Sequence, residues 1–442
     1  MSQHDKTMEL PSMAYRSWFL LIMTLVSASV VAERYMMVVL VEPIRRDLDL
    51  SDTQIALVKD LAIALVYILA VIPLSRVADR WSKRKMVAIA AAVWSVAMLI
   101  CGKAQSVGML ILGRAGIGLG EGAFTPPSQS WIADLFPVSQ RATALAIFLL
   151  GASAGQFIGP SFGGWAAAEY GWQQALIFGA IPGFILAPIV YFTLRDVPLG
   201  LADGHHRQPP ALLPFWATVK QIWSIPTFPP LIFAAGLNAL LTLGLIGWAP
   251  AFMERTHGMP AREVGPQLGL FLMIGSAVGH TLGGPLADSL GRRSLRWYVS
   301  IMLISGLLAT LIAVVALNGP KEWALPLFGL NLMIGGMSAA PLLAVVAGLP
   351  PAQSRSTAVA MLMVAINVIG LGAVPVFVGW LSDLLRPEFG EESLRMAMQA
   401  VLLVCIPSTI LSWIASKHVV ADFAKVGITS AGDGGTRPAA MH

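Results

Sequence analysis

Long runs of apolar residues follow one another along almost the whole chain, separated by short polar stretches. A run of about 18 or more apolar residues is long enough to cross the hydrocarbon core of a bilayer as a helix. The first run is longer than the core of a cleavable signal sequence and contains charged residues, so we expect it to be a permanent helix. The pattern predicts twelve membrane-spanning helices, at residues 17–40, 54–78, 86–104, 107–133, 141–167, 172–194, 229–254, 265–290, 294–317, 323–348, 355–385 and 393–417.

The polar sequence between these runs repeats itself. Residues 75–84 read SRVADRWSKR, and residues 284–293, 209 positions later, read GPLADSLGRR; each ends an apolar run. A second pair of related stretches lies at residues 136–146 and 349–360. Six predicted spans separate the two copies, so both copies begin on the same side of the membrane. The sequence therefore predicts an all-α membrane protein of twelve transmembrane helices, built as two parallel six-helix repeats with a cleft between them.

The predicted spans divide the chain into five parts. Lys and Arg concentrate in alternate loops and in both tails, so the positive-inside rule places both termini in the cytoplasm, and we expect a multi-pass protein of the bacterial inner membrane. The parts are a cytoplasmic N-tail (1–16), a first six-helix bundle (17–194), a cytoplasmic linker with a surface helix (195–228), a second six-helix bundle (229–417) and a disordered cytoplasmic tail (418–442).

Composition narrows the class of protein. Only 12% of residues are charged and 56% are hydrophobic, whereas soluble proteins carry about twice that charged fraction. The net charge of +5 comes from loops beside the spans, which argues against nucleic acid as a partner. Cys101 and Cys405 lie inside spans and offer neither a disulfide framework nor a metal site. The sequence shows no nucleotide-binding loop and no nucleophile–base arrangement, so we expect neither an ATP-driven pump nor an enzyme, and no cofactor.

The repeated Ala-Asp and basic cluster resembles the sequence mark of the major facilitator superfamily. A closer resemblance, over about residues 15–415, is to the bacterial branch of the Spinster family; it is carried by residues 50–54, 113–122, 248–258, 366–372 and 379–385. The resemblance implies alternating access and, in bacterial members, coupling to protons. Eukaryotic members are associated with sphingosine phosphate and lysophospholipids. Anion–cation symporters of the same superfamily carry a similar Gly-Glu-Gly passage, so a sugar acid or an aromatic acid remains an alternative cargo.

A charged residue inside a predicted span is a functional hypothesis by default, and the first such group is Glu33, Arg34, Arg114 and Glu121. Glu33 and Arg34 are neighbours that point about 100° apart on a helix, so we expect their partners on other helices. Arg114 and Glu121 are nearly two turns apart and share a face. We expect Glu33 and Glu121 to bind and release the driving ion, H+, while Arg34 and Arg114 hold those carboxylates ionised or attract an anion. The family has Asp where this chain has Glu33. The alternative is a permanent ion-pair network that only fixes helix packing.

A second charged group flanks the predicted cytoplasmic ends of the spans. A carboxylate beside a helix N-terminus and an Arg is stabilised by both, so we expect a latch that closes the cytoplasmic side and opens in the inward-facing state. For Lys83, Arg84 and Lys85 the positive-inside rule is a sufficient explanation. The predicted latch residues are Asp79, Arg80, Arg141, Asp288, Arg292 and Arg355.

Weaker candidates for substrate contacts are polar residues within the spans. Hydrogen bonds between helices explain the amides equally well, snorkelling explains Lys59, and packing explains His280. The candidates are Lys59, Gln129, Gln156, Asn238, His280, Asn331 and Asn367. The prediction as a whole is a monomeric, proton-coupled secondary transporter that moves a small organic or amphipathic anion across the lipid bilayer by alternating access. The alternatives are a proton symporter for sugar acids or aromatic acids, and a non-transporting receptor with the transporter fold.

Overall fold

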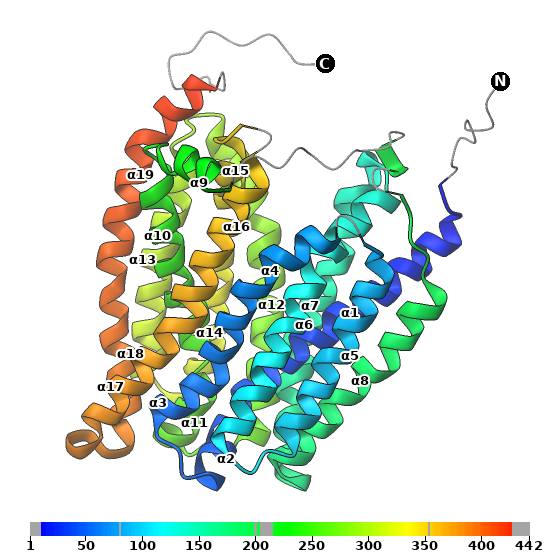
Figure 1. Ribbon diagram of the computed structural model, residues 1–442. Helices are drawn as coiled ribbons and strands as arrows, with labels where there is room; N and C mark the ends of the chain where they lie inside the picture. The colour runs from blue at the N-terminus through cyan, green and yellow to red at the C-terminus, as the bar shows by residue number, and fades with distance from the viewer. Residues whose placement is uncertain (1–9, 79–80, 199–200, 204–214, 352–353, 427–442) are drawn as a thin grey trace, which may run out of the picture.

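The computed structural model describes residues 10–78, 81–198, 201–203, 215–351 and 354–426. Within these ranges every regular element is a helix (Figure 1). This follows from the apolar runs, because a chain segment in hydrocarbon must satisfy its own backbone hydrogen bonds. In the first half the elements are α1 (Met13–Val39), α2 (Val41–Asp47), α3 (Asp52–Ala56), η1 (Leu57–Leu61), α4 (Ala62–Ala78), α5 (Lys83–Gly102), α6 (Val107–Leu135), α7 (Val138–Tyr170) and α8 (Trp172–Thr193).

The linker contains a short turn, η2 (Leu201–Asp203), and a helix, α9 (Phe215–Trp223), where the sequence predicts a surface helix. The second half consists of α10 (Phe228–Ala239), η3 (Leu240–Gly244), α11 (Ala249–His257), α12 (Ala261–Gly291), α13 (Trp297–Asn318), α14 (Lys321–Gly336), α15 (Ala339–Gly348), α16 (Arg355–Ala365), η5 (Ile366–Ala373), α17 (Val374–Phe389), η6 (Gly390–Glu392), α18 (Ser393–Val401), η7 (Leu402–Val404) and α19 (Cys405–Lys425). The elements η1, η3 and η5 are π-helical.

The number of membrane crossings agrees with the prediction of twelve. By length and composition, ten described helical segments could cross a membrane, and an eleventh is the pair of α9 and α10–η3, which is bent by 91°. The last of the ten, residues 357–425, includes α17, η6 and α18. Its chain reverses at Gly390, whose φ of 55° favours glycine, so this segment crosses twice.

The two halves approach each other at one face and separate toward the other (Figure 1). At the bottom of the view, α3 of the first half packs against α17 of the second. At the top, where α1 begins and α19 ends, the halves lie farther apart. Helices α7 and α12 also join the halves, and glycine lets their backbones approach: a Cβ on Gly265 would lie 2.2 Å from the carbonyl oxygen of Pro160.

The predicted start of the tail at residue 418 is wrong, because α19 continues to Lys425. Asp422, on this additional part of the helix, accepts hydrogen bonds from the backbone nitrogen of Thr227 (3.0 Å) and from its Oγ1 (2.7 Å). Thr227 immediately precedes α10, so the carboxylate caps that helix and ties α19 to it. Residues 427–442 lie outside the described part of the chain.

Candidate functional site

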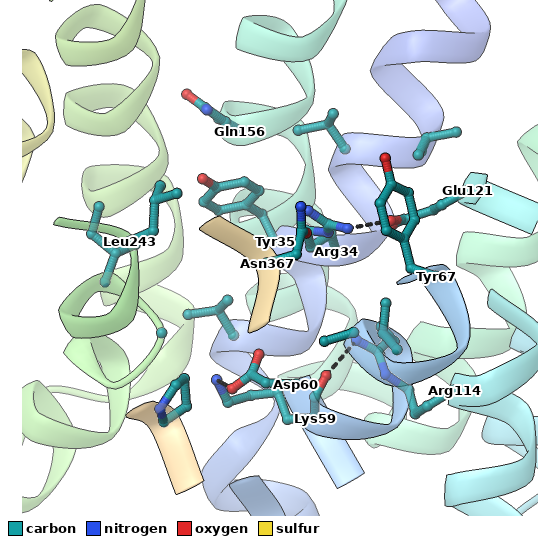
Figure 2. A pocket seen from close by; sticks show the side chains of 18 of the residues that line it. Arg34, Tyr35, Lys59, Asp60, Tyr67, Arg114, Glu121, Gln156, Leu243 and Asn367 are labelled. Carbon is teal, nitrogen blue, oxygen red and sulfur yellow. Dashed lines mark hydrogen bonds and ion pairs between the residues drawn. The ribbon is translucent and has the colours of Figure 1, made fainter. Parts of the chain in front are cut away.

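A cavity of about 340 Å³ lies between the two halves (Figure 2). The first half contributes side chains from α1, η1, α4, α6 and α7, and the second half contributes side chains from η3, η5, α17 and the turn that follows η3. Valine, isoleucine and leucine side chains form part of the wall, and charged, phenolic and amide groups form another part. The cavity therefore has both an apolar and a charged surface.

Arg34 and Glu121 form an ion pair across the cavity wall, between α1 and α6. The Glu121 carboxylate is almost completely buried, whereas about a third of the Arg34 side chain is exposed. Figure 2 shows Tyr67 of α4 beside this pair. The expectation that Arg34 finds its partner on another helix is confirmed.

Glu33 and Arg114 are buried beside this pair. Arg114 Nη2 donates to the backbone oxygen of Lys59 at 3.0 Å, while its Nε and Nη1 make no hydrogen bond within the described residues. Glu33 Oε1 is likewise buried and accepts none there. The charges of Arg114, Glu121 and Arg34 all act on the Glu33 carboxyl group. Arg114 and Glu121 line the cavity, but Glu33 does not in this conformation.

A second ion pair, Lys59 with Asp60, lies on η1 at the end of the cavity shown at the bottom of Figure 2. The Lys59 side chain is 2% exposed, and its Nζ lies 5.6 Å from the centre of the Trp248 ring of the second half. Burial of this amine excludes the snorkelling explanation for Lys59, because a snorkelling ammonium reaches water.

The predicted polar contacts divide into two groups. Gln156 and Asn367 line the cavity, as Lys59 does. Asn238 and Asn331 are buried away from it, where they donate to backbone oxygens: Asn238 to Met302 at 3.0 Å, and Asn331 to Ala309 at 2.8 Å. For these two residues the explanation by hydrogen bonds between helices holds.

Gln129 and His280 are exposed on the protein surface, outside the cavity lining. Their contact with cargo stays a prediction.

The predicted latch falls partly outside the description. Asp79 and Arg80 lie outside the described residues, and the side chain of Arg355 is not described. Arg141 Nη2 donates to the backbone oxygen of Ala133 at 2.7 Å, and Asp288 accepts a hydrogen bond from the Tyr298 hydroxyl at 3.0 Å. Arg292 is exposed. The latch therefore stays a prediction.

Lys83 has a structural role, so the positive-inside rule is not a sufficient explanation for this residue. Its side chain is buried in an ion pair with Asp134, and its Nζ donates to Ser130 Oγ at 2.7 Å. This pair joins the start of α5 to the end of α6.

Sequence reasoning missed a buried group of charges that joins the halves at the bottom of Figure 1. We name Glu42, Asp52, Arg255 and Asp383 the interhalf cluster. Arg255 donates to both oxygens of Asp52, at 2.7 and 2.6 Å, and its Nε donates to Glu42 at 2.6 Å. Asp383 accepts hydrogen bonds from the backbone nitrogens of Asp52 (2.9 Å) and Thr53 (2.8 Å), and so caps α3.

The interhalf cluster keeps Arg255 charged. Burial lowers the pKa of the Arg255 guanidinium, but hydrogen bonds and charge from Asp52 and Glu42 outweigh burial and raise this pKa above its ordinary value. Three members of the cluster stand in stretches that carry the family resemblance, which is the signal in the sequence that could have located them.

The comparisons with known proteins agree with this architecture. The model of the Major Facilitator Superfamily matches residues 22–375. The chain belongs to this superfamily. It is therefore a multi-pass membrane transporter of two six-helix halves.

Similar proteins are known from both bacteria and animals. An "MFS-type efflux pump" of Mycolicibacterium smegmatis is 31% identical over 91% of this chain and 93% of its own. "Protein spinster homolog 1" of Bos taurus is 24% identical over 84% of this chain and 74% of its own. A crystal structure of a bacterial homologue of the human lysosomal transporter Spinster, in an inward-facing and unoccupied conformation, matches with a TM-score of 0.82 and 25% identity, over 93% of this chain and 99% of that one.

Proposed function

We propose that this transporter is a proton-coupled secondary carrier that moves a small organic or amphipathic anion by alternating access. It lies in the bacterial inner membrane as a monomer, with both termini in the cytoplasm. The observation that carries the proposal is the Arg34–Glu121 ion pair in the wall of the cavity between the halves.

This pair has the chemistry that proton coupling needs. A carboxylate can take up a proton and lose its charge, whereas a guanidinium keeps its charge at every working pH. Protonation of Glu121 releases Arg34, which then attracts the anionic group of the cargo. Glu33, buried beside Arg114, is the second carboxylate that can take part once the cavity reaches it.

The arrangement of the halves supports alternating access. The interhalf cluster closes one face, and the halves separate toward the face where α1 begins and α19 ends (Figure 1). With that second face in the cytoplasm, the conformation is inward-facing. The inward-facing state named for the similar solved structure supports the same assignment.

The lining of the cavity supports an amphipathic cargo. Two side-chain amides line it, Gln156 and Asn367, beside an apolar surface that includes Val30, Val31 and Leu243. A sugar acid would need more amide and hydroxyl partners than this lining provides. The second candidate, an acidic polar metabolite, is supported by relatives named as a probable sulfoacetate transporter in Cupriavidus necator, 28% identical over 61% of this chain, and a probable galactarate/D-glucarate transporter in Bacillus subtilis, 24% identical over 69%.

The test uses purified protein in proteoliposomes. A thermal-stabilisation screen of lysolipids and organic acids at two pH values identifies a cargo, whose flux is then measured with and without a pH gradient. Glu121→Gln is expected to abolish flux driven by the pH gradient while the protein stays folded. Glu388→Gln, a change at an exposed carboxylate, is the control. Undiminished proton-driven flux in Glu121→Gln would remove Glu121 from the mechanism, and absence of any flux in the wild type would favour the receptor alternative.

A further inference from the structure

We propose that Lys59 binds the anionic group of the cargo, and that Asp60 occupies this ammonium while the site is empty. The inference deepens the proposed function and rests on it in one respect, namely that the cargo is an anion. It places a contact with the negative charge of the cargo at the end of the cavity nearest the interhalf cluster, in addition to the contact at the Arg34–Glu121 pair.

The residues around Lys59 provide an aromatic ring and space for its ammonium group. Trp248 is fully buried, and its Nε1 donates to the backbone oxygen of Pro375 at 3.2 Å, which fixes the ring beside Lys59 Nζ. Residue 247 is glycine, and a Cβ there would lie 2.9 Å from Lys59 Nζ. The second half therefore offers the ammonium an aromatic face and the space that a side chain at position 247 would fill.

One contact of this ammonium can be exchanged. Trp248 and Gly247 belong to the packed frame, whereas the carboxylate of Asp60 lines the cavity and is 19% exposed. A buried ammonium without a counter-charge is strongly unfavourable, so Asp60 can leave only when another anion takes its place. An anion that enters the cavity meets Lys59 directly, because Lys59 lines the same cavity.

Arg114 adds positive charge at the same place. Its Nη2 holds the backbone oxygen of Lys59 at 3.0 Å, and its Nε and Nη1 are buried without a hydrogen-bond partner in the described residues. Three cations, Arg34, Lys59 and Arg114, and two carboxylates, Glu121 and Asp60, line the cavity. A third carboxylate, Glu33, lies buried beside Arg114 but outside the lining. The cavity surface itself therefore suits an anion.

Two substitutions separate this role from a structural one, because their effects have opposite signs. Lys59→Met removes the contact with the anion and is expected to weaken anion binding by about tenfold or more, which corresponds to about 1.4 kcal/mol. Asp60→Asn removes the competitor of the anion and is expected to tighten binding by about threefold. A pair that only stabilises the helices would give weaker binding, or no change, in both variants.

The measurement is isothermal titration calorimetry on the full chain in lipid nanodiscs, with octyl sulfate as the probe. Octyl sulfate is a monoanion at every working pH, so its own protonation does not complicate the result. Octanol is the uncharged match, inorganic sulfate is the anion without a chain, and Lys103→Met, at an exposed lysine, is the control variant. The two charge variants are expected to bind octanol as the wild type does.

Unchanged octyl sulfate affinity in Lys59→Met, or weaker affinity in Asp60→Asn, would overturn the proposal. Failure of the wild type to bind octyl sulfate would overturn it as well. Displacement by inorganic sulfate at equal concentration would support Lys59 as the anion site but assign it to small anions. If Glu121→Gln still abolishes proton-driven flux while Lys59→Met leaves octyl sulfate affinity unchanged, the proposed function stands and this inference fails.

Discussion

Replacing Arg255 by methionine is expected to open the face that the interhalf cluster closes. Arg255, Glu42 and Asp52 are each no more than 2% exposed, and Arg255 pairs with both carboxylates. Arg45 also pairs with Glu42 at 3.1 Å and lies 4.0 Å from Asp52. Removing the sole partner of a buried charge costs about 3–5 kcal/mol; because Arg45 remains beside both carboxylates, we expect a cost of about 1.5–3 kcal/mol here. Because this contact joins the two halves, the cost falls on the closed conformation. The equilibrium between the closed and open face should therefore shift by about 10- to 10²-fold toward opening.

The assay is labelling of a single cysteine at Asn367, which lines the cavity, in a variant without Cys101 and Cys405. A membrane-impermeant maleimide is applied from the face closed by the cluster, and Arg255→Met is expected to label at least about tenfold faster than its parent. The matched control is Arg46→Met, because Arg46 pairs with Glu254 at 2.9 Å but is 60% exposed. Exposed pairs contribute about 0–1 kcal/mol, so this change should have a small effect. Equal labelling rates in Arg255→Met and its parent would refute the reasoning.

The charge of Arg255 itself should not make the closure pH-dependent. A group whose pKa is raised in the folded protein contributes stability that is present below its unfolded pKa and is lost only as pH rises through the folded pKa. The ordinary pKa of arginine already lies above about 12, and the cluster raises the pKa of Arg255 further. Its contribution to closure is therefore constant across the working range of pH, and the opening caused by Arg255→Met should be equally large at pH 6 and pH 9.

Three further substitutions test the packing. Lys83→Met should lower stability by about 1.5–3 kcal/mol, because it removes a buried ammonium that pairs with Asp134 and donates to Ser130; thermal unfolding against Lys85→Met, at an exposed lysine, checks this, and equal melting temperatures would contradict it. Gly265→Ala should destabilise the contact between α7 and α12, since the new Cβ would lie 2.2 Å from Pro160 O, whereas Gly108→Ala meets nothing within 4 Å and should be tolerated. Asp422→Ala should cost about 1–2 kcal/mol through loss of the cap on α10, and an unchanged unfolding temperature would show that this cap is dispensable.

Much of the fold is predictable because it depends on local sequence. Apolar length determines which segments cross the membrane, and the repeated Ala-Asp punctuation identifies two related halves. The pairing of Arg34 with another helix is also predictable, because a charge in hydrocarbon requires a partner. Which partner it takes is a matter of tertiary structure, and Glu121 lies 87 positions away.

The remaining features depend on which way each side chain faces. A span that is apolar on all sides has no stripe to mark its cavity side, so Asn331 and Asn367 look alike in the sequence although only Asn367 lines the cavity. The interhalf cluster was missed for a related reason. Its partners Asp52 and Arg255 are 203 positions apart, and charged residues just beyond the ends of spans are ordinary on any membrane protein.

The position of Lys59 connects the cavity to the closure in physical terms. Lys59 lies seven residues after Asp52, and Trp248 lies seven residues before Arg255. Seven residues are about two helical turns, or about 10 Å. The two sides of the Lys59–Trp248 contact are therefore the same two segments that meet again in the interhalf cluster. Under the proposed mechanism, an anion takes the place of Asp60 on the ammonium while Trp248 stays beside it, so the cargo binds at one of two consecutive contacts between these segments. Cargo bound at Lys59 lies about two helical turns from the buried cluster, so the anion is placed beside the segments that hold this face closed.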